Sequence, residues 1–371
     1  MVFARGARVR EQFDWPLFLG VVTIAIIGVV NLYSATSPYI GDPRRSGLAD
    51  MYVQQVYWLV VGGLLGTLAA VIDYRSIERF AYFLYGAGIF SLFLVLWLAS
   101  DIRGSSRWID LGRFAFQPSE FMKIFVILAV ARKLADDPRT EARTLGELLP
   151  AALLFVAPAI LVMLQPDFGT SMIYTATALT MLALTRMRRS SLALFVIGLV
   201  PSSWGMWHFG LRDYQKGRIL SFLDPEADRT GTGWHAFQSR TAIGNGGVWG
   251  EGFKEGTQNQ FGFLPDQFSD FPFSVFAEDW GFVGCIALLA MYAFVCAWAI
   301  NIASLARDRF GAAVAVGVGA TFFWHTLFNI GMTLGVLPVV GITLPLFSYG
   351  GSSTLTTLVG FGLLMNVSLR R

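Results

Sequence analysis

The chain has 371 residues, of which 54% are hydrophobic and 14% are charged, and its mean hydropathy is +0.56. A soluble domain carries about 25% charged residues, so this chain has too few to cover a water-soluble fold of its size. The composition excludes an ordinary soluble enzyme, a disordered protein and a coiled-coil rod. It predicts an integral membrane protein, and the net charge of +3 gives no reason to expect a nucleic-acid partner.

Ten segments are long and apolar enough to cross a membrane, which takes about 20 residues per helix. They predict an all-α polytopic membrane protein with a single domain over residues 1–371. The expected spans are 15–35, 52–72, 77–99, 117–134, 148–165, 168–185, 190–209, 271–304, 311–336 and 345–368.

Arginine and lysine in the short connections predict the orientation, because such residues concentrate on the cytoplasmic side. With ten spans, the basic clusters all fall on one side and both termini are cytoplasmic. Segment 210–270, between the seventh and eighth spans, then becomes a large extracytoplasmic loop. It is rich in aromatic residues, so we expect it to be ordered and packed over the outer face; these residues are Trp234, Phe237, Trp249, Phe253, Phe261 and Phe263.

The first unusual polar group opens the fourth span. Pro118 suits the first turn of a helix, and Glu120 and Lys123 lie three residues apart on one helical face. They form either a self-contained ion pair or one polar wall of a cavity.

The second group begins at Asp270, where the loop meets the eighth span among aromatic residues. Desolvation would raise the pKa of this carboxyl toward that of a general base. A helix-capping role is the alternative, and it is compatible with the first. Glu278 follows on a similar helical face and could instead pair with another helix.

Two further motifs lie at helix starts. Asp167 stands in the tight turn 165–170, where it either caps a helix or serves a site. The run 344–353 pairs glycines with hydroxyl groups, so it predicts either an anion-binding helix start or a kink. The glycine-rich run 243–250 does not match the dinucleotide fingerprint, and the isolated His208, His235 and His325 show no zinc spacing.

The polar groups gather at the expected outer ends of the spans, next to lipid. They suit a lipid that carries phosphate, and either a transporter or an enzyme could use one. Transporters usually place such groups near the bilayer midplane, so their outer position favours an enzyme.

Six motifs in order along the chain resemble the SEDS family (shape, elongation, division and sporulation). Within it, three runs make the chain most similar to the RodA branch: 256–260, 329–332 and 337–341. The chain has Phe268-Ser269 and Glu278-Asp279 where the family usually has His-Thr and Glu-Glu. The six family motifs are 106–109, 117–120, 165–170, 270–273, 277–281 and 345–353.

The resemblance implies a peptidoglycan glycosyltransferase of the bacterial cytoplasmic membrane that polymerises lipid II into β-1,4 glycan during cell elongation. It implies that Asp270 is the catalytic base. It also suggests that the enzyme depends on Mg²⁺ or Mn²⁺, although the sequence shows no ligand set for the ion, and that it needs no organic cofactor. The partners that the resemblance implies are polyprenyl-pyrophosphate-linked glycan and a class B penicillin-binding protein.

We expect the substrate-binding residues to come from the same motifs and the outer loop. They are Arg107, Gln117, Ser119, Glu120, Lys123, Arg218, Gln238, Gln258, Glu278, Ser348, Gly350 and Ser352, with Asp167 and Asn329 in structural or undecided roles. Two other functions stay open: a lipid II flippase, and a non-catalytic scaffold for the penicillin-binding protein.

Overall fold

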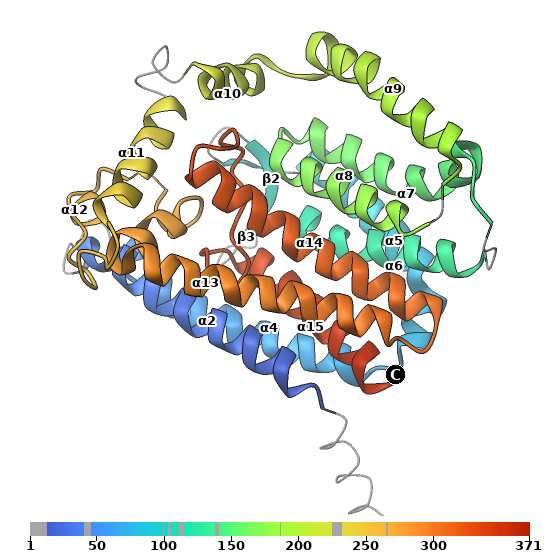
Figure 1. The fold of residues 1–371 in the computed structure, drawn as a ribbon, viewed down its shortest axis with the longest axis horizontal. Coiled ribbons are helices and arrows are strands. Elements are labelled where there is room, and N and C mark those ends of the chain that lie inside the picture. Colours follow the sequence, from blue (N-terminus) through green and yellow to red (C-terminus); the bar gives the residue numbers. More distant parts are fainter. Residues whose placement is uncertain are drawn as a thin grey trace, which may run out of the picture.

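The computed structural model describes residues 13–40, 46–98, 100–102, 105–110, 115–137, 141–185, 187–224, 232–264 and 266–371. Ten of the described helices have 16 residues or more, and they correspond in order to the ten predicted spans (Figure 1). They are α2 (Trp15–Thr36), α4 (Met51–Val71), α5 (Tyr74–Leu98), α6 (Pro118–Ala135), α7 (Leu145–Leu164), α8 (Phe168–Ala183), α9 (Arg189–Gly205), α13 (Pro272–Ser304), α14 (Arg309–Thr333) and α15 (Gly351–Leu369). The all-α membrane fold is confirmed.

Eight of these helices are long and apolar enough to cross a membrane. The other two, α6 and α8, fall short of that measure and lie against α14, while α5 and α7 pack on them from the other side. The number of spans and the side of each terminus stay predictions.

The centre of the bundle is formed by α14 and α15. Among the candidate spans these two are the most buried, and α14 packs against α6, α8, α13 and α15. Small residues allow close approach elsewhere: a Cβ on Gly362 would overlap the carbonyl oxygen of Gly66, so α15 and α4 meet backbone to backbone. In contrast, α9 lies along one edge and has almost no buried residues (Figure 1).

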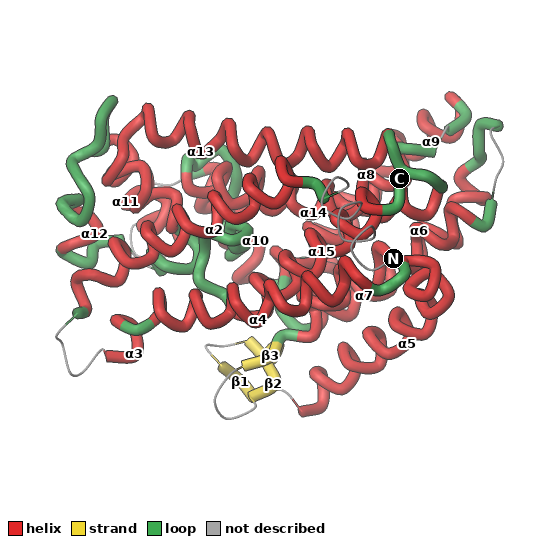
Figure 2. Tube along the Cα trace, turned by 90° about the horizontal axis from the view of Figure 1, so that it is seen from below, coloured by secondary structure: helices red, strands yellow, loops and turns green. Residues whose placement is uncertain are grey.

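The connection between α5 and α6 contains a small sheet that the sequence analysis did not predict. It has three antiparallel strands, β1 (Ser100–Ile102), β2 (Ser105–Asp110) and β3 (Ala115–Phe116). Figure 2 shows this sheet near the end of α5, outside the helical bundle. Its importance is that β2 carries Arg107.

Two of the predicted helices need correction, one at its start and one in its interior. The last helix does not begin at 345: Leu346 has φ +64° and Gly350 is also non-helical, so α15 begins only at Gly351. Helix α13 has the predicted ends but is interrupted at Gly281, with φ +63°. The carbonyl oxygens of Gly247 and Val248 accept the backbone N–H groups of Phe282 and Val283, which the interruption frees.

Segment 210–270 has helical structure where it is described, in α10 (Asp213–Leu223), α11 (Thr232–Asn245) and α12 (Thr257–Gln260). Residues 225–231 and 265 lie outside the described part. Its six aromatic side chains are each exposed by at least 39%, so they contribute little to holding the segment against the bundle. Polar contacts to α2 and α13 hold it: the Asn259 amide donates to the carbonyl oxygen of Ser34, and the Glu278 carboxylate accepts backbone N–H groups of α12. Its packing over the outer face stays a prediction. Shorter elements are η1 (Ser37–Tyr39), α3 (Ser46–Ala49) and the π-helical turn η2 (Met206–Gly210).

Candidate active site around Asp270

Asp270 lies in a tight turn just before α13. The backbone N–H groups of Ser269, Asp270 and Phe271 all donate to the carbonyl oxygen of Asp266, at 3.0–3.3 Å. The helix is capped at Phe271 without any side-chain hydrogen bond, so the capping role considered for Asp270 is wrong. Its half-buried carboxylate is therefore not committed to the helix.

Residues from α14 and from the connection 341–350 surround this turn. The Asn329 side-chain amide donates to the carbonyl oxygens of Asp270 at 3.0 Å and Ile342 at 2.7 Å. Gly341 has φ +72°, and a Cβ there would lie 3.5 Å from Oδ2 of Asp270. The N–H of Tyr349 donates to the carbonyl oxygen of Phe268. Asn329 thus links the backbone of Asp270 to the backbone of Ile342, next to Gly341.

The pKa of Asp270 is raised to about 6, mainly by burial and to a smaller extent by the neighbouring Asp266 carboxylate. The Ser269 hydroxyl and the positive charges of Arg107 and Arg218 oppose this rise. Two arginines from distant segments, one on β2 and one on α10, are thus near enough for their charges to act on the Asp270 carboxylate. A carboxyl with this pKa is mostly ionised at neutral pH and is still basic enough to accept a proton.

Arg107 belongs to a cluster with Gln117, Asp167 and Ser352. Its Nη1 lies 3.2 Å from Oδ1 of Asp167, and Oδ2 of Asp167 accepts the Gln117 amide at 2.9 Å. The Gln117 N–H donates to the Ser352 hydroxyl at 3.2 Å. Asp167 also caps α8 by accepting the N–H of Thr170, as predicted. The side chain of Arg107 is 30% exposed, and its buried Nε has no hydrogen-bond partner among the described residues.

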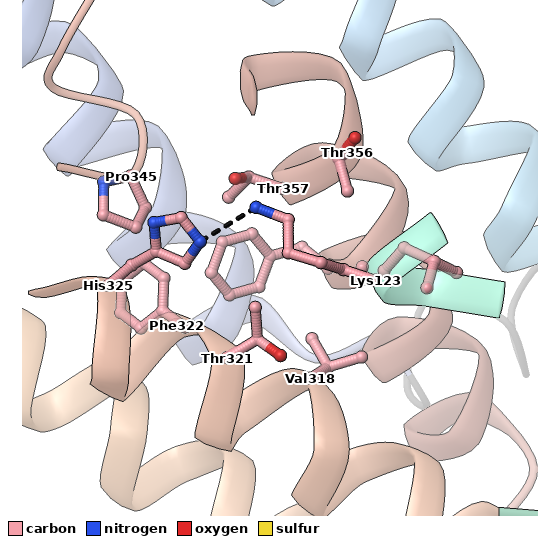
Figure 3. A pocket seen from close by; sticks show the side chains of 11 residues that line it. Lys123, Val318, Thr321, Phe322, His325, Pro345, Thr356 and Thr357 are labelled. Carbon is pink, nitrogen blue, oxygen red and sulfur yellow. Dashed lines mark hydrogen bonds between the residues drawn. The ribbon is translucent and has the colours of Figure 1, made fainter. Parts of the chain in front are cut away.

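Glu120 and Lys123 form the predicted ion pair, 2.8 Å apart and buried within the bundle. The ion pair is therefore confirmed. Lys123 also lines a small cavity whose lining does not include Glu120, so a polar wall formed by both residues stays a prediction. The sequence analysis missed His325, whose Nε2 lies 2.9 Å from Nζ of Lys123 (Figure 3). Ser119 lies beside them, and its backbone carbonyl accepts the Tyr174 hydroxyl.

Glu278 and Gln258 do not join this site. The Glu278 carboxylate accepts the backbone N–H groups of Gln258 at 2.8 Å and Asn259 at 3.2 Å, so it fastens the short helix α12 onto α13. Its substrate-binding role is therefore wrong: the acid is fully buried and occupied by the loop. Gln238 is buried in α11.

Ser348 and Gly350 are likewise used by the protein itself. The Ser348 hydroxyl accepts the N–H of Leu344 at 2.7 Å, and the N–H of Gly350 donates to the Gln55 side chain at 3.3 Å. Gln55 also donates to the carbonyl of Ser348. These groups build the turn before α15 and are not presented to an anion. Gln55, missed by the sequence analysis, is recognisable only as a buried polar residue in an apolar span.

Comparisons with known proteins add to this geometry. The model of the family of cell cycle proteins that includes FtsW, RodA and SpoVE matches residues 15–371. The peptidoglycan glycosyltransferase MrdB of Escherichia coli K12 is 36% identical over 362 residues, which cover 98% of this chain and 96% of MrdB.

Two solved structures are also similar. A chain of a peptidoglycan synthase complex that coordinates polymerization and crosslinking superposes with a TM-score of 0.80 at 33% identity, covering 96% of this chain and 97% of that chain. The rod shape determining protein RodA of Thermus thermophilus gives a TM-score of 0.69 at 30% identity, and the match covers 96% of both chains.

Proposed function

The chain belongs to the FtsW, RodA and SpoVE family of cell cycle proteins, and on that premise we propose how its Asp270 site works. The protein is a multi-pass enzyme of the bacterial cytoplasmic membrane, a peptidoglycan glycosyltransferase of the RodA type. It polymerises lipid II into β-1,4 glycan during cell elongation. The half-buried Asp270 carboxylate, on whose pKa the charges of Arg107 and Arg218 act, is the observation that carries the proposed mechanism.

Asp270 acts as the general base. It accepts the proton of the 4-hydroxyl of the incoming lipid II, and that oxygen attacks the anomeric carbon at the reducing end of the growing glycan. The bond from this carbon to the polyprenyl diphosphate breaks as the glycosidic bond forms. Because ionised Asp270 predominates at neutral pH, the base is present in its active form.

Arg107 and Arg218 neutralise the leaving diphosphate. The charges of both side chains act on Asp270, and the part of the Arg107 guanidinium that stays exposed offers donors to the diphosphate. Asp167 and Gln117 hold the guanidinium in place through the Asp167 ion pair. Fixed donors at a developing negative charge lower the barrier because they need no reorganisation during the reaction.

Dependence on Mg²⁺ or Mn²⁺ is part of the proposal, but the described residues supply no dedicated cage. No three His, Cys, Asp or Glu side chains lie together in the part of the chain that the structure describes. A hard cation often binds through substrate phosphates, its own waters and one or two carboxylates. The cation would thus arrive with the diphosphate.

A class B penicillin-binding protein is the proposed partner. The similarity to a chain of a synthase complex that couples polymerization to crosslinking supports this pairing. Co-purification of the two membrane proteins, and a higher polymerisation rate in the pair than in the single chain, would test it.

The decisive experiment uses the purified full chain with lipid II, and measures glycan strands by gel electrophoresis. Asp270→Asn should lower the rate at least 100-fold, because a general base contributes about that much or more. The matched control is Glu255→Gln, an exposed acid of the same outer segment, which should polymerise normally.

The same preparations separate the two other functions. Normal polymerisation by Asp270→Asn would overturn the assignment of the base. Transbilayer movement of lipid II in proteoliposomes, without polymer, would establish a flippase. If rod-shaped cells keep their shape when Asp270→Ala replaces the native protein, the protein acts as a scaffold.

A further inference from the structure

Two side chains on one face of α14 hydrogen-bond to the connection 341–350, which lies beside Asp270. His325 and Asn329 are four residues apart, so their side chains lie on the same side of the helix. Asn329 donates to the carbonyl oxygens of Ile342 and Asp270, and Nδ1 of His325 lies 3.1 Å from the carbonyl oxygen of Thr343. Two side chains of one helix therefore fix the backbone immediately after Gly341.

The opposite edge of the imidazole is held from α6. Nε2 of His325 lies 2.9 Å from Nζ of Lys123, which is itself 2.8 Å from the Glu120 carboxylate. A carbonyl oxygen only accepts hydrogen bonds, so Nδ1 must carry the proton, and Nε2 is left to accept from the ammonium group. The hydrogen bonds therefore run in one direction: Lys123 donates to Nε2 of the ring, and Nδ1 donates to the carbonyl oxygen of Thr343.

Hydrogen bonds, more than close packing, fix the position of this ring. His325 and Lys123 both line the small cavity between α6, α14 and α15, whose other walls include Thr321, Pro345 and Thr356 (Figure 3). Space on one side of the imidazole means that loss of either hydrogen bond lets the ring move.

The proposed mechanism uses neither Lys123 nor His325, yet their contacts end at Thr343, two residues from Gly341, which faces the Asp270 carboxylate. We propose that His325 is a positioning residue: held by Lys123, it fixes Thr343 and thereby places Gly341 against the Asp270 carboxylate. This inference rests on the proposed function of Asp270, and it assigns the buried Lys123–Glu120 pair a role in catalysis without contact to substrate.

Three substitutions separate the two hydrogen bonds of the ring. In His325→Asn, the amide nitrogen takes the approximate place of Nδ1 and can still donate to Thr343, but the contact with Lys123 is lost. In His325→Gln, the amide oxygen reaches the approximate place of Nε2 and keeps Lys123 but not the bond to Thr343. His325→Leu loses both. The control is Thr326→Val, a neighbouring buried residue whose hydroxyl, within the described part of the chain, bonds only to the carbonyl of Phe322 in the same helix.

Two measurements on the purified full chain read the outcome. The first is steady-state polymerisation, in which kcat for His325→Leu should fall about tenfold, the size expected from loss of the hydrogen bond to Thr343, with little change in the KM for lipid II. The second is amide hydrogen exchange, in which the peptide over 341–347 should exchange faster while the melting temperature stays near that of the native protein. His325→Asn should retain more activity and protection than His325→Gln, and Thr326→Val should match the native protein.

Native kcat in His325→Leu, with Asp270→Asn inactive, would overturn this inference and leave the proposed function intact. Equal losses in all three variants, together with a lower melting temperature, would assign His325 to packing and also overturn it. If the native chain makes no glycan, the proposed function fails. The exchange measurement then still decides whether His325 fixes the 341–347 segment.

Discussion

Asp14 and Asp270 stand just before long helices at opposite ends of the bundle, and their carboxylates lie in contrasting surroundings. Asp14 is buried and accepts hydrogen bonds from the Trp298 indole at 2.7 Å, the Ser368 hydroxyl at 2.6 Å and the N–H of Leu17 at 3.4 Å. Arg371 lies 3.8 Å away. Asp270 is half-buried and does not cap its helix, and its pKa is raised.

The same contrast holds for neighbouring polar groups. At the Asp14 end, Asn366 donates to two carbonyl oxygens of the chain leaving α4, and the Tyr74 hydroxyl donates to Asp308. Buried polar atoms without a partner among the described residues gather instead at the Asp270 end, including Arg107 Nε, Ser119 Oγ and Asn329 Oδ1. Arg143 Nε, in the connection after α6, is an exception. Such groups are costly in a finished fold, so their number at this end is consistent with the site proposed around Asp270.

Asp14→Ala should have the largest effect, and the effect should be on stability. The substitution leaves the Trp298 indole and the Ser368 hydroxyl buried without an acceptor, so we expect a loss of about 3 kcal/mol in the free energy of unfolding. Thermal unfolding in detergent would measure it, while kcat below the transition should be unchanged. Asp50→Ala, an exposed acid that caps nothing, is the control. Equal melting temperatures would show that Asp14 does not hold this end together.

Arg107→Ala should instead lower activity and leave stability nearly unchanged. Asp167 keeps its bonds from Gln117 and Thr170, so the fold should tolerate the change. The loss of a charged donor at the leaving group should lower kcat/KM about 100-fold. Arg240→Ala is a matched control, because Arg240 is an exposed arginine packed over Gly335 near the same end. Similar losses in both variants would mean that general positive charge, and not the position of Arg107, matters.

The contrast also separates what the sequence could and could not predict. Nine of the ten long helices begin within three residues of the predicted starts, because apolar length is a local property. Asp167 as a helix cap and the Glu120–Lys123 pair were predictable for the same reason, since each is formed within four residues.

Long-range partners were not predictable. Glu278 looked like a functional acid because its true partners, the N–H groups of Gln258 and Asn259, come from a loop that folds back on it. Gln55 and His325 each stand alone in an apolar segment, and their contacts with Gly350 and Lys123 appear only once the helices pack. The break at Gly281 was not predictable because the N–H groups that it frees, those of Phe282 and Val283, bond to carbonyl oxygens more than thirty positions earlier in the chain.

Asp270→Asn should make the protein more stable at pH 8 while removing its activity. The folded state raises the pKa of this carboxyl from 3.8 to about 6, so keeping it ionised costs stability. This cost in stability is absent below the pKa that the carboxyl has in the unfolded chain, grows between about pH 4 and pH 6, and is constant at higher pH. Since the group is partly exposed, we expect a gain of about 1 kcal/mol at pH 8 and almost none at pH 4. Melting temperatures of the two proteins at both pH values would measure it, and an equal gain at both would exclude titration as the cause.

The smallest effect should be a shift in the pH dependence of Arg107→Gln. In the native enzyme, kcat/KM should rise with pH along a limb governed by a pKa of about 6, because only ionised Asp270 accepts the proton. Removing the Arg107 charge removes one influence that lowers this pKa, so the limb should move to higher pH. The loss of activity should therefore be greater at pH 6 than at pH 8, in assays of the residual rate across this range. Arg240→Ala should leave the limb in place, and an unmoved limb in Arg107→Gln would mean that Arg107 serves the leaving group without acting on the base.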